Sequence, residues 1–306
     1  MGAMTLLIDR RGAQARLYGA GVVEIRYPGG ETHRVGLRGL RRIIVQGEAQ
    51  LSSGLLRACH SDGVAVVLTP GRGRGESAHL FPSTHGTITL RHAQHTCHAD
   101  PVRRLALAAA LVAAKIEQQA LWLDAHGLDA AVVRRFVGDA ALAPSLDVLM
   151  GVEGAAAARY FGLWATTWQE PWHFPGRNRR PPRDPVNALL SLGYTLALNP
   201  IGQQAALRGL DLSLGFLHTP RSGRSALALD LLEPVRPWVD QWVWRLLGSG
   251  ELKPADFTYG AEEGCRLGKS GRAVFYRRWH TTEDAWLPRP ARHAMAIVLT
   301  HVRKTV

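Results

Sequence analysis

FLHTPRSGRSALALDLLEPVRP, residues 216–237, is the stretch around which the rest of the chain is organised. His218 lies at the edge of an apolar run, and a basic turn follows it. The helix-like segment after the turn is apolar, yet it carries Asp230 and Glu233. Residues three apart share a helical face, where carboxylates are costly unless they are paired or bind a metal. The stretch therefore predicts a cation and a further ligand elsewhere in the chain.

The composition indicates a large core and a strongly basic surface. The 306 residues are 46% hydrophobic, which is enough for two domains. Lys and Arg number 37 against 25 Asp and Glu, so the net charge is +12 with neutral histidines. Most of the excess is arginine, whose planar guanidinium suits phosphate, and this favours a polyanionic partner. A GC-rich genome accounts for Arg over Lys, but not for the net charge.

Cysteine usage and hydropathy indicate the cellular compartment. Three scattered cysteines give no disulfide framework, which is typical of a reducing environment. No signal peptide is evident, and the longest apolar run, residues 105–114, is far shorter than the roughly 20 residues that span a bilayer. We expect a cytoplasmic protein without a membrane partner.

The first part of the chain has the pattern of β structure. Apolar runs of strand length lie at residues 5–9, 15–18, 22–27, 32–37, 42–45 and 64–68. The turn Pro28-Gly29-Gly30 between the third and fourth runs predicts a β-hairpin. Ser52 is expected to cap a short helix that ends near Cys59. Residues 1–88 are therefore expected to form a small N-terminal β domain.

The remainder has the pattern of helices. They are expected at residues 101–123, 128–137, 145–167, 185–199 and 203–210, from the quoted stretch to about 247, and at 290–302, with a small hairpin at 266–276. Asp100 followed by Pro101 is typical of a helix cap and first turn. The fold class is α+β, and residues 89–306 are expected to form the larger, mainly α-helical domain.

Glu153 is the candidate for the missing ligand. It lies in a helical segment between glycines and four alanines, where small side chains permit either a close helix crossing or the approach of a bulky charged substrate. Glu153, His218 and Glu233, with Asp230 as an alternative ligand, would form a shell suited to Mg²⁺ or Mn²⁺. The alternatives are a half-buried histidine, and acids paired with Arg224 or Arg236.

Two further clusters have possible binding roles. Residues 92–98 contain three histidines and Cys97, but their spacing fits no standard zinc motif, and we interpret them as a polar linker between domains. A loop that follows Trp168, Trp172 and Phe174 carries Arg177, Arg179, Arg180 and Arg183. Guanidinium groups contact phosphates and aromatic faces stack on unpaired bases, so this loop favours nucleic acid over a solvated loop with packed aromatics.

With these segments identified, the chain resembles the CRISPR-associated spacer-acquisition integrases, the first-numbered Cas protein family. The resemblance covers nearly the whole chain. It is strongest at residues 149–157, 181–191, 214–218 and 227–237. It implies an N-terminal β-sandwich that serves dimerisation and partner contact, followed by a helical catalytic domain.

The resemblance also implies a site and partners. The family's metal ligands fall on Glu153, His218 and Glu233, and Asp230 matches a ligand or a residue just behind the ligands. Asn187 is implied as structural support. The DNA-contacting set is implied to be Arg177, Arg179, Arg180, Arg183, Arg221, Arg224 and Arg236. The implied partners are double-stranded prespacer and repeat DNA, a second copy of the chain, and the small second-numbered Cas protein.

The implied activity is a metal-dependent endonuclease and integrase of CRISPR adaptation, in the class of hydrolases that act on phosphodiester bonds. Prespacer 3′-OH ends would attack a phosphodiester of the repeat array by transesterification. Two alternatives remain open. One is a non-integrating metal-dependent nuclease on branched DNA or RNA, and the other is a DNA-binding scaffold with an inactive acidic site.

Overall fold

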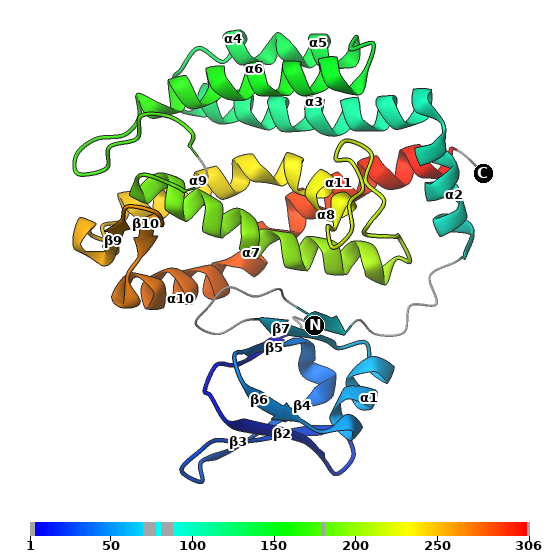
Figure 1. Cartoon of the computed structure of the whole chain (residues 1–306), viewed down its shortest axis with the longest axis vertical. Coiled ribbons are helices and arrows are strands. Elements are labelled where there is room, and N and C mark those ends of the chain that lie inside the picture. Colours follow the sequence, from blue (N-terminus) through cyan, green and yellow to red (C-terminus); the bar gives the residue numbers. More distant parts are fainter. Residues whose placement is uncertain (1–3, 70–77, 81–87, 179–180, 305–306) are drawn as a thin grey trace. The chain divides into compact units, whose positions relative to one another are not determined.

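Most strands lie in the first part of the chain and most helices in the rest of it in its computed structural model, which describes residues 4–69, 78–80, 88–178 and 181–304 (Figure 1). Two compact units are present: Met1–Thr87 with Ala206–Gly209, and Ile88–Ala205 with Leu210–Val306. The first unit contains eight strands and the second is mainly helical, so the predicted α+β class is confirmed.

Two four-stranded sheets build the N-terminal unit. Their strands are β1 (Met4–Ile8), β2 (Ala13–Tyr18), β3 (Val22–Arg26), β4 (Thr32–Gly36), β5 (Leu40–Gln46), β6 (Ala49–Leu51), β7 (Ala65–Thr69) and β8 (Ala78–Leu80). The strand orders are β1-β5-β7-β8 and β4-β3-β2-β6. β3 and β4 pair antiparallel from Val22↔Gly36 to Arg26↔Thr32, which confirms the hairpin. β1 and β7 both run parallel to β5.

One apolar cluster unites these sheets. Ile25 from one sheet and Ile43 from the other belong to the same buried group, together with Leu55 of α1 (Ser53–Ser61). The Ser52 side chain accepts a hydrogen bond from the Leu55 amide at 3.2 Å, as the cap prediction requires. A turn of 3₁₀ helix, η1 (Leu37–Gly39), links β4 to β5.

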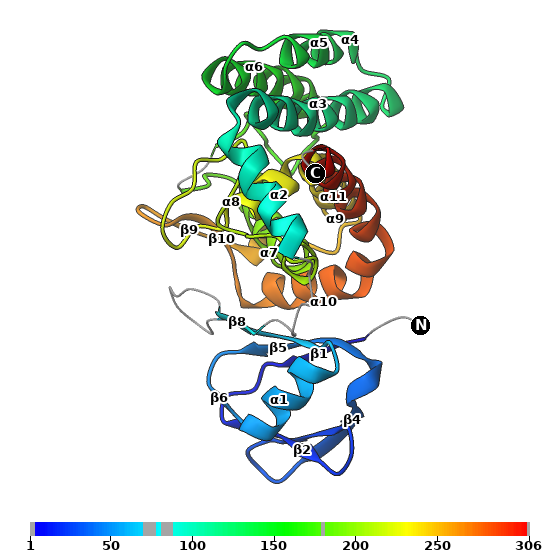
Figure 2. The same ribbon diagram turned by 90° about the vertical axis from the view of Figure 1, so that its right-hand side faces the viewer.

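The helical unit is arranged around α3. Its helices are α2 (Ile88–Ala99), α3 (Pro101–Ala125), α4 (Ala131–Arg134), α5 (Phe136–Ala141), α6 (Leu146–Ala165), α7 (Pro185–Leu207), α8 (Ala226–Leu232), α9 (Arg236–Gly248), α10 (Lys269–Trp286) and α11 (Pro288–Arg303), with 3₁₀ turns η2 (Glu233–Val235) and η3 (Pro254–Asp256). In Figures 1 and 2, α3 to α6 form one layer that faces α8, α9 and α11. α3 contacts α6, η2, α9 and α11, so it connects the two layers.

Helix α3 begins where the sequence predicts. The Asp100 side chain accepts hydrogen bonds from the amides of Val102 at 2.9 Å and Arg103 at 3.2 Å, and Pro101 occupies the first turn.

In the residues that the structure describes, no helix is long and apolar enough to cross a membrane.

Four segments differ from their predictions. Residues 92–98 belong to α2 and are not a linker. α7 continues through Pro200 to Leu207, so the two helices predicted at 185–199 and 203–210 are one. The prediction of a hairpin at 266–276 is wrong, because β9 (Phe257–Gly260) pairs with β10 (Gly264–Leu267) and α10 begins at Lys269. The helix expected to reach residue 247 is interrupted at η2, where Pro234 cannot donate a backbone hydrogen bond.

Two mid-helix glycines provide a paired test of this packing. A Cβ built on Gly193 of α7 would lie 2.7 Å from Cγ1 of Val239 in α9, whereas one on Gly162 of α6 meets no atom within 4 Å. We expect Gly193→Ala to lower the free energy of unfolding by about 1–3 kcal/mol through overpacking. Gly162→Ala should raise it by about 0.5–1 kcal/mol through helix propensity. Urea denaturation of both variants measures this, and equal effects would contradict the close contact of α7 and α9.

Candidate active site

The interruption at η2 sends the two acids of the opening stretch to different partners. Asp230 lies in α8 and Glu233 begins the 3₁₀ turn. Both are buried, with 0% and 5% of their surface exposed. The sequence places them on one helical face, but in the structure Asp230 binds the preceding loop and Glu233 binds cationic side chains from α3 and α9.

Asp230 organises the loop that carries His218. One carboxylate oxygen accepts the amides of Phe216 and, at 3.1 Å, Leu217. The other accepts the His218 amide at 2.9 Å and the His218 Nδ1 at 2.7 Å. A Cβ at Gly215 would lie 2.9 Å from the Asp230 carboxylate, so only glycine permits this approach. Because Asp230 fixes Nδ1, Nε2 is the ring nitrogen left for a metal or substrate.

Helix α2 holds the same loop from another side. Gln94 is fully buried and donates to the carbonyls of Asp211 and Leu214 at 2.9 and 3.0 Å, while its own carbonyl accepts the Asp211 amide at 2.8 Å. His98 Nδ1 donates to the Gly215 carbonyl at 2.7 Å. Burial and the nearby Arg104 guanidinium lower the pKa of His98. The polar residues of this segment therefore position the loop that leads to His218.

Residues 216–237 predict a cation near their carboxylates, and in the structure Lys115 occupies that position. The sequence analysis did not identify Lys115. It projects from the middle of α3 and donates to Glu153 Oε1 on α6 and, at 2.7 Å, to Glu233 Oε2. Its side chain is 7% exposed. The available signal was a single lysine on the apolar face of a helix, between the buried residues Val112 and Gln119.

Arg236 completes the surroundings of Glu233. Its Nε donates to Glu233 Oε1 at 2.8 Å, as the ion-pair alternative predicted. Burial acts to raise the pKa of Glu233, but the charges of Arg236 and Lys115 outweigh it and lower the pKa well below its usual range. The Arg236 guanidinium also lies 4.6 Å from the ring centre of Tyr194. Both oxygens of Glu233 are therefore held by cations.

The predicted arginines have different environments. Arg183 and Arg221 are exposed and Arg224 is partly exposed. Arg177 instead donates to Asn187 Oδ1 at 2.6 Å and to the Asn178 carbonyl at 2.7 Å, inside its own loop. The predicted DNA contacts of Arg179 and Arg180 concern residues outside the part of the chain that the structure describes.

Asn187 supports this loop through all of its amide groups. It is fully buried, accepts the Asn178 amide at 3.0 Å, and donates to the Gly176 carbonyl at 2.9 Å and to Asp184 at 2.7 Å. The base-stacking role expected for Trp172 and Phe174 is wrong, because these rings are 8% and 4% exposed and belong to the hydrophobic core. Their apolar area is used in packing.

The donor set around Lys115 suits a divalent cation in part. Oxygens of Glu153 and Glu233 converge on one positively charged atom, which is the arrangement that an oxygen-binding metal uses. His218 is near enough for its charge to lower the pKa of Glu233. Among the described residues, however, no three acidic, histidine or cysteine side chains already form a metal-binding group. The positions of the Glu153 and Glu233 oxygens suit a divalent cation. His218 is the neighbouring side chain that would complete its set of protein ligands.

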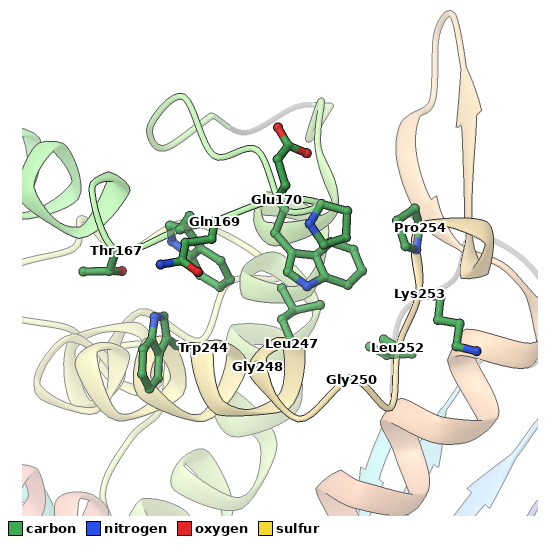
Figure 3. Close-up of a pocket in the computed structure, with 13 residues that line it drawn as sticks. Thr167, Gln169, Glu170, Trp244, Leu247, Gly248, Gly250, Leu252, Lys253 and Pro254 are labelled. Atoms are coloured by element: carbon green, nitrogen blue, oxygen red, sulfur yellow. The ribbon is translucent and has the colours of Figure 1, made fainter.

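A separate pocket of about 560 Å³ lies between the segment after α6 and the end of α9 (Figure 3). Trp168, Trp172 and Trp244 line it, with Glu170 and Lys253 at its edge. Glu153 is twelve residues before the end of α6, or about 18 Å along the helix at 1.5 Å per residue. The pocket therefore does not include the acidic pair.

Fold and site together define an α+β protein whose helical unit holds an acidic pair, the buried Glu233 and the partly exposed Glu153, beside a histidine. The family model for CRISPR associated protein Cas1 matches residues 6–281. The chain belongs to this family. It is 34% identical over 276 residues to CRISPR-associated endonuclease Cas1 2 of Rhodospirillum rubrum, covering 83% of this chain and 78% of the relative. A Cas1 endonuclease of Thermodesulfovibrio yellowstonii is 31% identical over 285 residues, with 89% of each chain covered.

Solved structures share the fold. A Cas1 protein from Thermotoga maritima superposes with a TM-score of 0.84 at 20% identity, covering 97% of this chain and 96% of the other. A casposase bound to its integration product gives a TM-score of 0.81 at 20% identity, with 98% and 91% covered. At these identities the likeness concerns the fold alone.

Gln94→Ala tests whether the hydrogen bonds from α2 stabilise the loop that carries His218. This change removes three hydrogen bonds of a fully buried side chain and leaves the Leu214 carbonyl and the Asp211 amide without that partner, so we expect the free energy of unfolding to fall by about 1–3 kcal/mol. Thr96→Ala is the matched control, because Thr96 is exposed on the same helix and its hydroxyl donates to the His92 carbonyl of that helix. It should change stability by less than about 0.5 kcal/mol. Equal urea denaturation curves for both variants would contradict the role of Gln94.

Asp240 gives a pH-dependent prediction. Burial raises its pKa to about 6, although a hydrogen bond from Tyr194 and the charge of Arg177 act in the opposite direction. The folded state therefore binds a proton more tightly than the unfolded state, and stability falls as pH rises between about 4 and 6. Relative to Asp240→Asn, the wild type should lose about 3 kcal/mol across this window. Chemical denaturation at several pH values measures the difference, and a pH-independent difference would contradict the raised pKa.

Proposed function

We propose that this chain is a metal-dependent DNA endonuclease and integrase of CRISPR adaptation. The observation that carries the proposal is the convergence of Glu153 and Glu233 on one cation position next to His218, in a member of the Cas1 family. Relatives are named CRISPR-associated endonucleases, and a casposase bound to its integration product has the same fold. These names support strand cleavage and strand joining as related activities of one site.

Glu153, Glu233 and His218 would hold a Mg²⁺ or Mn²⁺ ion. When bound, such an ion polarises a phosphodiester and orients an oxygen nucleophile. Asp230 fixes the Nδ1 side of His218, so that Nε2 is presented in one orientation. Arg236 holds the oxygen of Glu233 that Lys115 does not contact. The Arg236 and Glu233 side chains are only 14% and 6% exposed, which strengthens the electrostatic interaction between them.

The proposed reaction is an exchange of phosphodiester bonds. The 3′-oxygen of a prespacer end forms a bond to phosphorus in the repeat, and the bond from that phosphorus to the neighbouring 3′-oxygen breaks. The attacking hydroxyl loses its proton to solvent, and the leaving oxygen gains one. With water in place of the 3′-hydroxyl, the same site would hydrolyse DNA and act as an endonuclease.

DNA and protein partners follow from the surface and the relatives. Arg183 and Arg221 are exposed and Arg224 is partly exposed, so their guanidinium groups are suited to phosphates, and the chain carries +12 net charge. Solved structures with this fold include a Cas1–DNA complex and a Cas6-RT-Cas1–Cas2 complex. We therefore assign double-stranded DNA, Cas2 and a second copy of the chain as partners. The two sheets of the first unit share one core, which supports a β-sandwich serving these protein contacts.

One alternative has an observation in its favour. Lys115 and Arg236 together neutralise both glutamates, which is also how an inactive acidic site in a DNA-binding scaffold would be arranged. Retained DNA affinity with no turnover in Mg²⁺ or Mn²⁺ would support the scaffold. A non-integrating nuclease would instead cleave branched DNA equally well with and without a 3′-hydroxyl on the donor.

The proposal predicts that Glu153→Gln and Glu233→Gln each reduce strand transfer at least 100-fold, because a neutral amide is a weak ligand for a hard divalent cation. DNA affinity should change by less than about threefold, since the variants lose no positive charge. Glu262→Gln, at an exposed position, is the control and should keep full activity.

The assay is transfer of labelled prespacer duplexes into a supercoiled plasmid that carries a leader and a repeat. Duplexes ending in 3′-hydroxyl or 3′-dideoxy nucleotides are compared in Mn²⁺ and in EDTA. Full activity of either glutamine variant, or undiminished activity in EDTA, would refute the metal-dependent function. Equal reaction of both kinds of duplex would refute integration while leaving hydrolysis.

A further inference from the structure

Lys115 lies at the position where a metal ion would gain most from the acidic pair. Its ammonium donates to Glu153 on one side and, at 2.7 Å, to Glu233 on the other. The Lys115 and Glu233 side chains are 7% and 6% exposed. The Glu153 side chain is 25% exposed, so water is excluded from only part of the group, but two carboxylates this close still repel one another unless a cation lies between them. Lys115 lies between these carboxylates and is that cation.

The charges of this group already cancel. Glu153 and Glu233 supply two negative charges, while Lys115 and Arg236 supply two positive charges. A divalent cation that approached this intact group would meet no net negative charge and would adjoin an ammonium. If the ammonium left, two negative charges and one positive charge would remain, and the cation would be attracted. The metal and the Lys115 ammonium therefore compete for the same oxygens.

We propose that Lys115 is the resident counter-ion of the acidic pair, and that a divalent cation binds by displacing its ammonium from Glu153 and Glu233. This inference rests on the proposed function, which supplies the divalent cation. Lys115 acts as a positioning residue, because it keeps carboxylates from α6 and η2 at one point before the metal arrives. Its flexible four-carbon stem lets the ammonium move while α3 stays in place.

The test measures Mn²⁺ binding to the full chain after EDTA treatment, by electron paramagnetic resonance of free Mn²⁺. Lys115→Met removes the competing charge and keeps most of the apolar stem, so Mn²⁺ should bind at least ten times more tightly than to the wild type. Lys269→Met is the matched control, because Lys269 is exposed in the first turn of α10. It should bind Mn²⁺ as the wild type does.

Thermal unfolding supplies a second measurement. Without its counter-ion, Lys115→Met should unfold at a lower temperature than the wild type in EDTA. Mn²⁺ should then raise its unfolding temperature by more than it raises that of the wild type, because metal restores the missing charge balance. A merely structural lysine would give a loss that Mn²⁺ does not repair.

Lys115→Arg separates charge from displacement. It retains a cation whose planar group binds carboxylates through two hydrogen bonds, so Mn²⁺ should bind more weakly than to the wild type. This variant decides the matter if Lys115→Met does not fold: weaker binding supports the proposal, and equal or tighter binding overturns it.

Two results for the wild type and Lys115→Met would also overturn the proposal. Mn²⁺ binding by Lys115→Met that is no tighter than wild type would refute displacement and leave the metal-dependent function standing. Absence of Mn²⁺ binding by the wild type and every variant would refute both the displacement of Lys115 and the metal-dependent function.

Discussion

Two glutamates from separate elements must be neutralised inside the helical unit: Lys115 bridges both with one ammonium, and Arg236 supplies the second positive charge. Glu153 comes from α6 and Glu233 from η2, and each is brought to the lysine by its contact with α3. Leaving the buried Glu233 without a partner would cost several kcal/mol. The ion pairs of Lys115 therefore bear both on the packing of α3 against α6 and η2 and on the position of the site.

A second constraint acts on the histidine. Asp230 accepts three backbone amides and the His218 ring, while α2 binds the carbonyls of the same loop. The loop has little freedom, although it is not a helix or strand. A site that must present one imidazole nitrogen benefits from this rigidity, because orientation is fixed before a ligand arrives. The two acids of the opening stretch thus have separate tasks: Asp230 orients His218, and Glu233 faces the cation.

Much of this arrangement can be predicted from local sequence. The hairpin at Pro28-Gly29-Gly30 and the cap at Asp100 follow from backbone chemistry that depends on a few neighbouring residues. Glu153, His218 and Glu233 were selected as chemically competent side chains together with a family resemblance. The structure brings the two glutamates to one cation and places His218 close enough to influence Glu233.

Other features depend on tertiary contacts. Lys115 looks like an interruption in an apolar helix until Glu153 and Glu233 arrive from positions 38 and 118 residues further along the chain. The polar residues 92–98 suggest a linker, because their partners lie in a loop 117 residues away. Pro200 suggests a helix end, yet α7 continues through it. In each case long-range packing outweighs the local preference.

The most direct measurement is a crystal structure of the chain with Mn²⁺, with the ion located by its anomalous scattering. The account predicts one Mn²⁺ bound to oxygens of both Glu153 and Glu233, with Nε2 of His218 turned toward it and the Lys115 ammonium moved away from both carboxylates. A Lys115 that still bridges the two glutamates at saturating Mn²⁺, with no anomalous peak beside them, would contradict it.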